Sequence, residues 1–204
     1  MSPWNSDRGQ LKAGTLISKR HVIFAKHFPI AVGSRIVFVG EDGVACPCRI
    51  AATKAIAGSD IMIASLDYEV TPNIHPAKVL PSDYARWIGS GAGLPTVTFN
   101  QREELFVNDL DGLATNAFRR FARSYAPKSY VRTRFRRELI MGDSGNPSFL
   151  VVNGEAILLY CLTGGHGGSG APPHRYRYEI QQAMDELCPG YKLEEFDFSK
   201  IAGG

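Results

Sequence analysis

The chain has 204 residues, of which 44% are hydrophobic and 21% are charged, and its formal net charge is +3 at pH 7. That length suits one large β domain or two small ones, and the 21 glycines favour a turn-rich β architecture. No apolar run approaches the ~18 residues that a membrane helix needs, and residues 1–10 lack the apolar centre of a signal peptide, so neither is expected. The compartment stays open: secreted or periplasmic if a signal was removed from a precursor, otherwise cytoplasmic.

Short strands separated by turns fill the first half of the chain. Residues 14–28 read as a hairpin, with His27 just past its second strand. A tight turn is expected at residues 41–43, because the Asp-Gly pair there tolerates a positive φ. Residues 71–87 read as a loop with three prolines, and residues 89–95 form a Gly- and Pro-rich boundary between two halves. The strands expected in this half are 15–17, 21–25, 35–39, 44–52 and 61–66.

The second half shows the same pattern and ends in a helix. Residues 105–118 are ambiguous, residues 130–135 alternate with the period of a strand, and Asn153-Gly154 is a strong hairpin turn. Strands are expected at 95–99, 148–152 and 155–162. One amphipathic helix is expected where apolar residues recur at i, i+3, i+4 and i+7, at Ile180, Ala183, Met184 and Leu187. Many short strands, frequent turns and one late helix predict an all-β barrel or sandwich.

One segment carries much of the positive charge. Residues Arg119 to Arg137 include eight basic side chains and no acid, so the rest of the chain is net acidic. Such a block is typical of a nucleic-acid patch, but a solvated surface loop explains it more simply. Nucleic acid is therefore only a weak candidate partner, and no membrane partner is expected.

The four cysteines are Cys46, Cys48, Cys161 and Cys188. Cys46 and Cys48 would share one face of a strand, a spacing that does not easily reach disulfide geometry. A pair between Cys161 and Cys188 stays open, and no convincing set of zinc ligands is present. Free buried thiols are the preferred interpretation, and no metal site is expected.

The stretch Gly142-Asp143-Ser144-Gly145-Asn146-Pro147 has the composition of a nucleophile turn. Glycines let a backbone turn sharply and let a substrate approach closely, and a serine held there can expose its hydroxyl beside backbone N–H groups. An ordinary surface turn would use the same residue types. The motif therefore gains weight only if a base and an orienting acid occur elsewhere.

Three segments in the order His, Asp, Ser supply such a set. Residues 23–27 place His27 at a strand end, and residues 58–66 place Asp60 at the start of an apolar strand. With the serine stretch, this order resembles the chymotrypsin-like (trypsin-fold) serine peptidases, which carry segments like Ala-Ala-His-Cys, Asp-Ile-Ala-Leu and Gly-Asp-Ser-Gly-Gly-Pro. The resemblance covers residues 14–187 and is closer to compact bacterial and viral members.

The resemblance implies two six-stranded antiparallel β-barrels followed by a C-terminal helix. The corresponding division is an N-terminal extension at 1–13, a first barrel at 14–92, a second barrel at 93–178, and a helix and tail at 179–204. Function would then be endopeptidase hydrolysis of a peptide or protein substrate, without a metal or organic cofactor.

The resemblance also assigns roles to matching residues. Ser144 would be the nucleophile, and His27 would take its proton and later protonate the leaving amine. Asp60 would hold the His27 tautomer, and the backbone N–H groups of Gly142 and Ser144 would form the oxyanion hole.

Other acids and histidines compete for these roles. Asp67 closes the strand that Asp60 opens, and Asp42 lies in a turn. His21 sits inside a strand rather than past its end, while His166 and His174 follow the serine and so have the wrong order for this family.

Several residues depart from the family pattern. Phe28 stands where many relatives have a cysteine, Lys26 replaces a small residue, and Asn146 replaces the second glycine of the serine motif. No Ile-Val-Gly-Gly-like start precedes Gly14, so no zymogen cleavage of that kind is expected. Asp143 therefore needs another partner, either an arginine or backbone donors alone, because a buried unpaired carboxylate is costly.

The sequence indicates less about substrate preference than about the three catalytic candidates. Glu138 lies six residues before Ser144, the family position for the pocket floor, where an acid would attract Arg or Lys. Alternatively, Glu138 only neutralises Arg136 or Arg137. The stretch Thr163-Gly164-Gly165 would line the pocket wall by resemblance.

Three other functions stay open from the sequence. They are a catalytically silent binding module on the same fold, an esterase that uses the same three residues, and a nucleic-acid binder that uses the basic segment. The last would bind with strong salt dependence.

Overall fold

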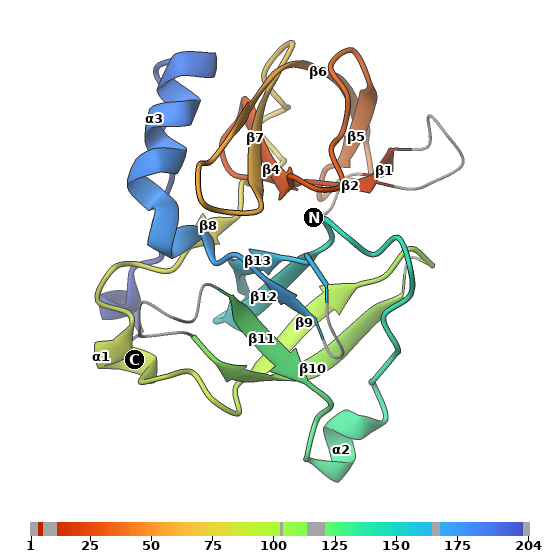
Figure 1. Cartoon of the computed structure of the whole chain (residues 1–204), viewed down its shortest axis with the longest axis vertical. Coiled ribbons are helices and arrows are strands. Elements are labelled where there is room, and N and C mark those ends of the chain that lie inside the picture. The colour runs from red at the N-terminus through yellow and green to blue at the C-terminus, as the bar shows by residue number, and fades with distance from the viewer. Residues whose placement is uncertain (1–3, 6–11, 103, 114–120, 165–167, 202–204) are drawn as a thin grey trace.

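Two β-sheets, one after the other along the chain, make up most of the structure. The computed structural model describes residues 4–5, 12–102, 104–113, 121–164 and 168–201. Within these residues each sheet has seven strands, and a helix near the C-terminus packs against the first sheet (Figure 1). The expectation of a mainly β protein with one late amphipathic helix is confirmed.

The first sheet curls around its longest strand. In the order β2-β1-β5-β6-β7-β4-β3, it contains β1 (Trp4–Asn5), β2 (Lys12–Ala13), β3 (Thr15–Leu16), β4 (His21–Ala25), β5 (Arg35–Val39), β6 (Ala45–Ala55) and β7 (Ile61–Leu66). The first part of β6 pairs with β5 and its second part pairs with β7, with a bulge between Ile50 and Ala52. A bulge increases the local twist, so β6 bends the sheet over its own core.

Alternation along β6 shows why this segment forms a half-buried strand. Cys46, Cys48 and Ile50 are buried, whereas the intervening Pro47 and Arg49 are exposed. Successive strand residues point to opposite faces, so Cys46, Cys48 and Ile50 meet the core while Pro47 and Arg49 face water. This core also takes apolar side chains from β4, β5 and β7.

The second sheet follows the order β14-β11-β10-β9-β12-β13-β8. Its strands are β8 (Lys78–Val79), β9 (Pro95–Phe99), β10 (Leu105–Gly112), β11 (Ala122–Tyr125), β12 (Pro147–Val152), β13 (Glu155–Cys161) and β14 (Ser169–Gly170). The hairpin turn predicted between β12 and β13 is confirmed, with φ of 49° at Asn153 and 82° at Gly154. Two consecutive residues with positive φ match the twist of the flanking strands.

The helix α3 (Arg177–Leu187) joins the core through one face. Ile180, Ala183 and Met184 are buried among apolar residues of β7, including Ile61 and Ile63. The predicted spacing is therefore the buried face of the helix. The shorter helical segments are α1 (Ala85–Ile88), α2 (Tyr130–Thr133) and the 3₁₀ turns η1 (Pro173–Tyr176) and η2 (Phe198–Lys200).

Three predictions about local structure need correction. Residues 4–5 and 12–13, expected in an N-terminal extension, form β1 and β2 of the first sheet. Residues 71–87, expected as a loop, contain β8 and most of α1. Because β8 pairs with β13, the chain enters the second sheet before the predicted boundary at residue 92.

The third correction concerns residues 130–133, which form α2 rather than a strand. The backbone N–H of Thr133 donates to the Ser129 carbonyl at 2.9 Å. The Thr133 hydroxyl donates to the carbonyls of Pro127 and Ser129. These local bonds close one helical turn, so the alternation in the sequence was a misleading signal.

All four cysteines carry free thiols, with Cys188 half-buried and the other three buried. The Sγ atoms of Cys46 and Cys48 are 4.0 Å apart on the buried face of β6. In the described part of the chain, no helix is long and apolar enough to cross a membrane. No group of three or more His, Cys, Asp or Glu residues suited to a metal ion occurs among the same residues.

Candidate active site

Two turns of the first sheet bring His27 and Asp60 together. His27 lies in the turn after β4, and Asp60 directly precedes β7, the strand that pairs with β4. The backbone N–H of Lys26 donates to the Asp60 carbonyl at 3.0 Å. The backbone N–H of His27 donates to Oδ1 of Asp60 at 2.9 Å. The pairing of the two strands therefore sets the position of both side chains.

Ser144 reaches the same place from the second sheet, in the turn just before β12. The turn is fastened to the end of β13, because the Gly145 N–H donates to the Leu162 carbonyl and the Leu162 N–H donates to the Asn146 carbonyl, both at 2.8 Å. Gly145 has φ of 88°. A Cβ at this position would lie 2.8 Å from the Ala13 carbonyl oxygen of the first sheet. Glycine is therefore required both for the backbone conformation and for the close approach.

The three side chains form one hydrogen-bonded chain. Nδ1 of His27 lies 2.6 Å from Oδ2 of Asp60, and Nε2 of His27 lies 2.9 Å from Oγ of Ser144. Because a carboxylate only accepts hydrogen bonds, Nδ1 carries the proton and Nε2 is left to accept from the serine hydroxyl. The His27 side chain is 42% exposed and that of Asp60 is 16% exposed. A base placed this way can remove the hydroxyl proton as the oxygen attacks an electrophile.

The competing histidines and acids take other positions. His21 and His174 are buried, and burial lowers the pKa of each to about 4. His166 lies outside the described residues. Asp67 accepts a hydrogen bond from the Arg49 backbone N–H, and Asp42 accepts one from the Val44 backbone N–H. None of these described residues joins the His27 chain.

The backbone N–H groups of Gly142 and Ser144 are the ones expected to form an oxyanion hole. Gly142 and Ser144 both line a pocket next to the serine hydroxyl. Among the described residues, neither N–H has a hydrogen-bond partner, whereas the N–H groups of Asp143 and Gly145 are both bonded. Two such donors are the components of an oxyanion hole.

Asp143 is held by backbone donors. Its carboxylate is buried, and it accepts hydrogen bonds from the backbone N–H of Gln101 at 2.8 Å and from that of Ile140 at 2.7 Å. Burial raises the pKa of this carboxyl group, which the two backbone bonds and the charge of Arg102 partly offset. Of the two partners expected for Asp143, the backbone alternative is therefore the one found in the described chain.

The pocket beside Ser144 is mainly apolar and has a volume of about 540 Å³. Its walls are residues 139–144 together with Leu162 and Gly164. Glu138 is exposed and is not among these residues, so the structure does not bring it to the pocket floor. Leu139 lies in the wall instead, one position further along the chain.

Of residues 163–165, which were predicted to line the pocket wall, only one is found there among the described residues. Gly164 lines the pocket, whereas Thr163 does not, although its N–H bonds to the Ser169 carbonyl at 2.7 Å. Gly165 lies outside the described residues.

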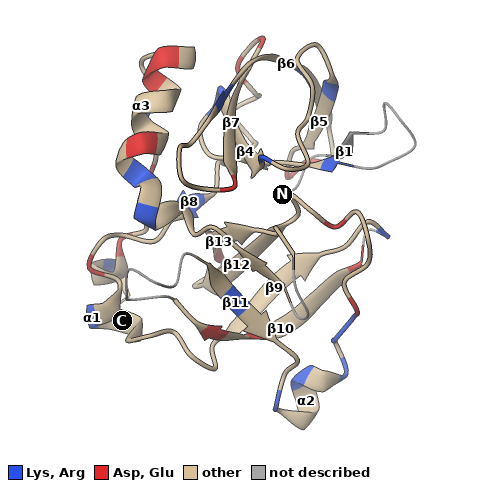
Figure 2. Cartoon of the chain, in the orientation of Figure 1, with Lys and Arg blue, Asp and Glu red and all other residues tan. Residues whose placement is uncertain are grey.

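Of the basic segment, the structure describes residues 121–137, which run through β11 and α2 (Figure 2). Arg119 and Arg120 lie outside the described residues. Arg132 forms two hydrogen bonds with the carboxylate of Asp109, which is 2% exposed. Arg137 pairs with Glu104 at 3.5 Å. Part of this positive charge is therefore neutralised within the protein.

Two parts of this site were not found in the sequence. Gln101, which contacts the serine turn, belongs to a polar loop that gives no signal of a role. The apolar pocket did leave a trace, since the run Leu139-Ile140-Met141 directly precedes the serine motif. Apolar residues next to a nucleophile turn could have been read as a pocket wall.

A comparison with the models of known protein families finds no match for this chain. A comparison with curated proteins finds none either.

Proposed function

We propose that the protein is a serine endopeptidase that hydrolyses peptide bonds through an acyl-enzyme on Ser144. The observation that carries this proposal is the continuous chain from Asp60 through His27 to Ser144, with distances of 2.6 and 2.9 Å. A silent binding module would have no need for a base within hydrogen-bond reach of a serine on a glycine turn.

The mechanism follows from the order of these groups. Oγ of Ser144 attacks the carbonyl carbon of the scissile bond while Nε2 of His27 accepts the hydroxyl proton. The tetrahedral intermediate then expels the amine, which takes that proton from His27 and leaves an ester on Ser144. Water, deprotonated by His27, attacks this ester, and the serine leaves with the proton returned by His27. Asp60 keeps the ring oriented and stabilises its charged form throughout.

The developing oxyanion would be bound by the N–H groups of Gly142 and Ser144. Both are without partners among the described residues, so binding the oxyanion breaks no internal bond in that part of the chain. One such donor is usually worth about 2.7–4 kcal/mol of transition-state stabilisation.

We also propose that the two sheets are the two barrels of the chymotrypsin-like fold. The first sheet supplies His27 and Asp60, the second supplies Ser144, and the three meet where the sheets face each other. This division of the site between the sheets supports the family resemblance, as does the order His, Asp, Ser along the chain.

The pocket indicates the class of side chain next to the cleaved bond. Leu139, Ile140 and Leu162 line it, and among the described residues its only charged lining side chain is the Asp143 carboxylate, both of whose oxygens accept backbone hydrogen bonds. Burying an apolar side chain here is favourable, whereas a charged one would lose its hydration without a partner. The preferred residue on the acyl side is therefore apolar, such as Leu, Met or Phe.

Labelling by a fluorophosphonate, which reacts with activated serines, tests the proposal. We expect the wild-type protein to be labelled at pH 8 and Ser144→Ala to be unlabelled. Cleavage of a mixed peptide library then separates a peptidase from an esterase. A folded wild type that the probe does not label would overturn the proposal, and cuts confined to Arg or Lys would overturn the apolar preference.

A further inference from the structure

We infer that Gln101 is a positioning residue that holds the serine turn in the shape that exposes the oxyanion donors. This inference rests on the proposed function, and it concerns a loop of the second sheet that contains none of the three hydrogen-bonded side chains. Gln101 lies in this loop between β9 and β10, of which the structure describes residues 100–102 and 104.

Gln101 contacts the serine turn with both its main chain and its side chain. Its backbone N–H donates to Oδ1 of Asp143 at 2.8 Å. Its side-chain amide Nε2 donates to the carbonyl of Gly142. The loop therefore reaches two consecutive residues of the turn, one through a carboxylate and one through the peptide bond itself.

The Gln101 amide packs so closely against Gly142 that no space is left for a side chain at position 142. Gly142 has φ of 99°, a conformation that favours glycine. A Cβ at this position would overlap the Gln101 amide group. The amide therefore packs directly onto the turn backbone, where any larger residue at position 142 would displace it.

Asp143 closes the turn from the other side. Its N–H donates to the Ile140 carbonyl at 3.1 Å, and its Oδ2 accepts from the Ile140 N–H at 2.7 Å. The peptide group between Gly142 and Asp143 is thus held at both ends, its carbonyl by Gln101 and its N–H by Ile140. With that peptide fixed, the neighbouring N–H groups of Gly142 and Ser144 remain available at the pocket.

The described residues on either side of Gln101 are tied together by the side chain of Asn100. Asn100 is buried, and its side-chain oxygen accepts from the backbone N–H groups of Arg102 and Glu104 at 3.0 and 3.1 Å. Its Nδ2 donates to the Glu104 carboxylate at 2.7 Å. A loop fixed by a buried amide can hold a contact more precisely than a mobile one.

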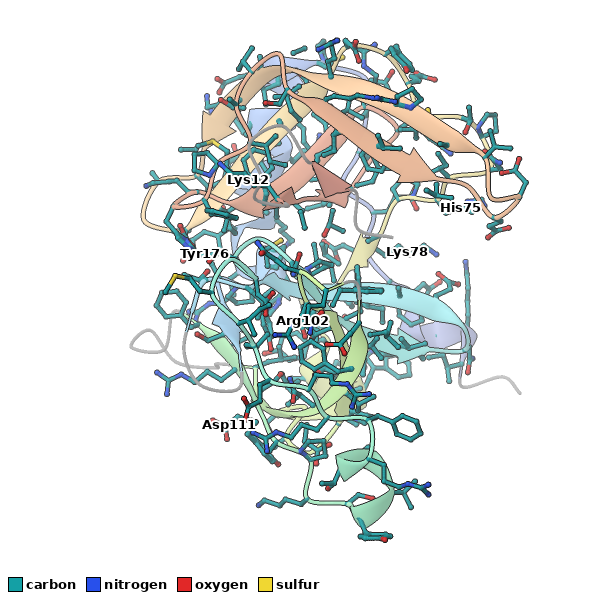
Figure 3. All side chains as sticks on the ribbon, turned by 90° about the vertical axis from the view of Figure 1, so that its right-hand side faces the viewer. Lys12, His75, Lys78, Arg102, Asp111 and Tyr176 are labelled. Carbon is teal, nitrogen blue, oxygen red and sulfur yellow. The ribbon has the colours of Figure 1, made fainter. Side chains whose placement is uncertain are left out.

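In the described chain the Asp143 carboxylate accepts hydrogen bonds from two backbone N–H groups, and Arg102, labelled in Figure 3, acts on it through its charge. The clamp from Gln101 therefore supplies the directional contacts that an ion pair to the turn would otherwise provide. Its loss should disturb the transition state more than substrate binding, because the oxyanion exists only in the transition state.

The test compares the rate and the extent of fluorophosphonate labelling in three variants. Gln101→Ala removes the amide, and Gln101→Met keeps most of its volume but has no N–H to donate. Glu104→Gln, in the same loop, keeps an oxygen that can accept from Asn100 and serves as the matched control. Thermal unfolding of each variant is measured alongside.

We expect both Gln101 variants to be labelled to completion but at least about tenfold more slowly, below the 10²–10³ typical of removing an oxyanion donor outright. The Glu104→Gln variant should be labelled at the wild-type rate. If Gln101 only stabilised the fold, its substitution would lower the fraction of protein that is labelled. The labelling rate of the molecules that remain folded would then be unchanged.

Three labelling results would contradict the inference, each for a different reason. If the wild type is labelled and Gln101→Met reacts as fast as the wild type, the amide only fills space and the inference is wrong. If the Glu104→Gln control slows as much as Gln101→Met, the loop rather than the amide matters, and the inference is again wrong. A wild type that is never labelled overturns the proposed function together with this inference.

Discussion

Nε2 of His27 lies 2.9 Å from Oγ of Ser144, although 117 positions separate the two residues in the chain. One residue comes from a turn of the first sheet and the other from a turn of the second. Their meeting depends on Gly145, whose backbone passes against Ala13 of the first sheet. The contact between the sheets and the contact between the two side chains are therefore parts of the same arrangement.

Asp60→Asn should slow fluorophosphonate labelling by on the order of 10³–10⁴-fold without unfolding the protein. An amide can donate to Nδ1 of His27 and so stabilise the tautomer that no longer accepts from Ser144. The labelling rate measures the effect, and Asp42→Asn, in a distant turn, is the control. A loss below tenfold would show that His27 does not depend on the 2.6 Å contact with Asp60.

Gly164→Val should narrow the pocket without disturbing the fold. A Cβ on Gly164 would have no atom of the described residues within 4 Å, and its φ lies outside the left-handed region, so the backbone accepts a side chain there. Because Gly164 lines the pocket, we expect cleavage after Phe or Leu to fall by tenfold or more relative to cleavage after Ala. Peptides that differ only at this residue give the measurement.

The matched control for that change is Gly164→Ala, which adds one methyl group and should shift the preference less. Fluorophosphonate labelling with a small probe should stay near the wild-type rate in both variants. An unchanged preference in Gly164→Val would mean that the side chain next to the cleaved bond binds elsewhere.

Gly145→Ala should reduce the free energy of unfolding by about 1–3 kcal/mol, because alanine is strained at positive φ. In addition, its Cβ would press on the Ala13 carbonyl at 2.8 Å, between the two sheets. Chemical denaturation measures the loss. Gly58→Ala is the control, since Gly58 has φ of 68° and nothing within 4 Å of an added Cβ. Equal losses in the two variants would show that contact between the sheets adds nothing to the strain.

His174→Phe should make the protein more resistant to acid. Burial, with the nearby charges of Arg175 and Arg177, lowers the His174 pKa from 6.5 to about 4. The unfolded chain therefore takes up a proton at a higher pH than the folded chain does. The wild type loses stability as the pH falls from about 6.5 to about 4. Phenylalanine does not take up a proton, so His174→Phe lacks this contribution to the pH dependence of stability.

Phenylalanine also keeps the edge-to-face contact that His174 makes with Tyr84, whose ring centre is 4.9 Å away. The free energy of unfolding, measured from pH 7 to pH 4, should fall less steeply with decreasing pH in the variant than in the wild type. His75→Ala, at a side chain that is 68% exposed, is the control and should follow the wild type. An identical pH dependence in His174→Phe and wild type would contradict the assignment.

Local patterns predicted the segments that carry the site. The apolar strands before His27 and after Asp60, and the glycines around Ser144, are written in short stretches of sequence, because strand alternation and turn chemistry act over a few residues. The same reasoning failed at residues 130–133, where the backbone N–H of Thr133 bonds to the Ser129 carbonyl and closes a helical turn. Periodicity over so few residues does not separate the two outcomes.

The amino-acid sequence by itself predicted most of the longer strands, the Asn153-Gly154 hairpin turn, the late amphipathic helix and the three residues of the hydrogen-bonded chain from Asp60 to Ser144. Only the tertiary structure decided that Leu139 rather than Glu138 faces the pocket and that Gln101 holds the turn around Gly142. The reason is physical: backbone propensity and side-chain periodicity are local, whereas the direction of an irregular loop and its partners depend on how two sheets distant in sequence pack together.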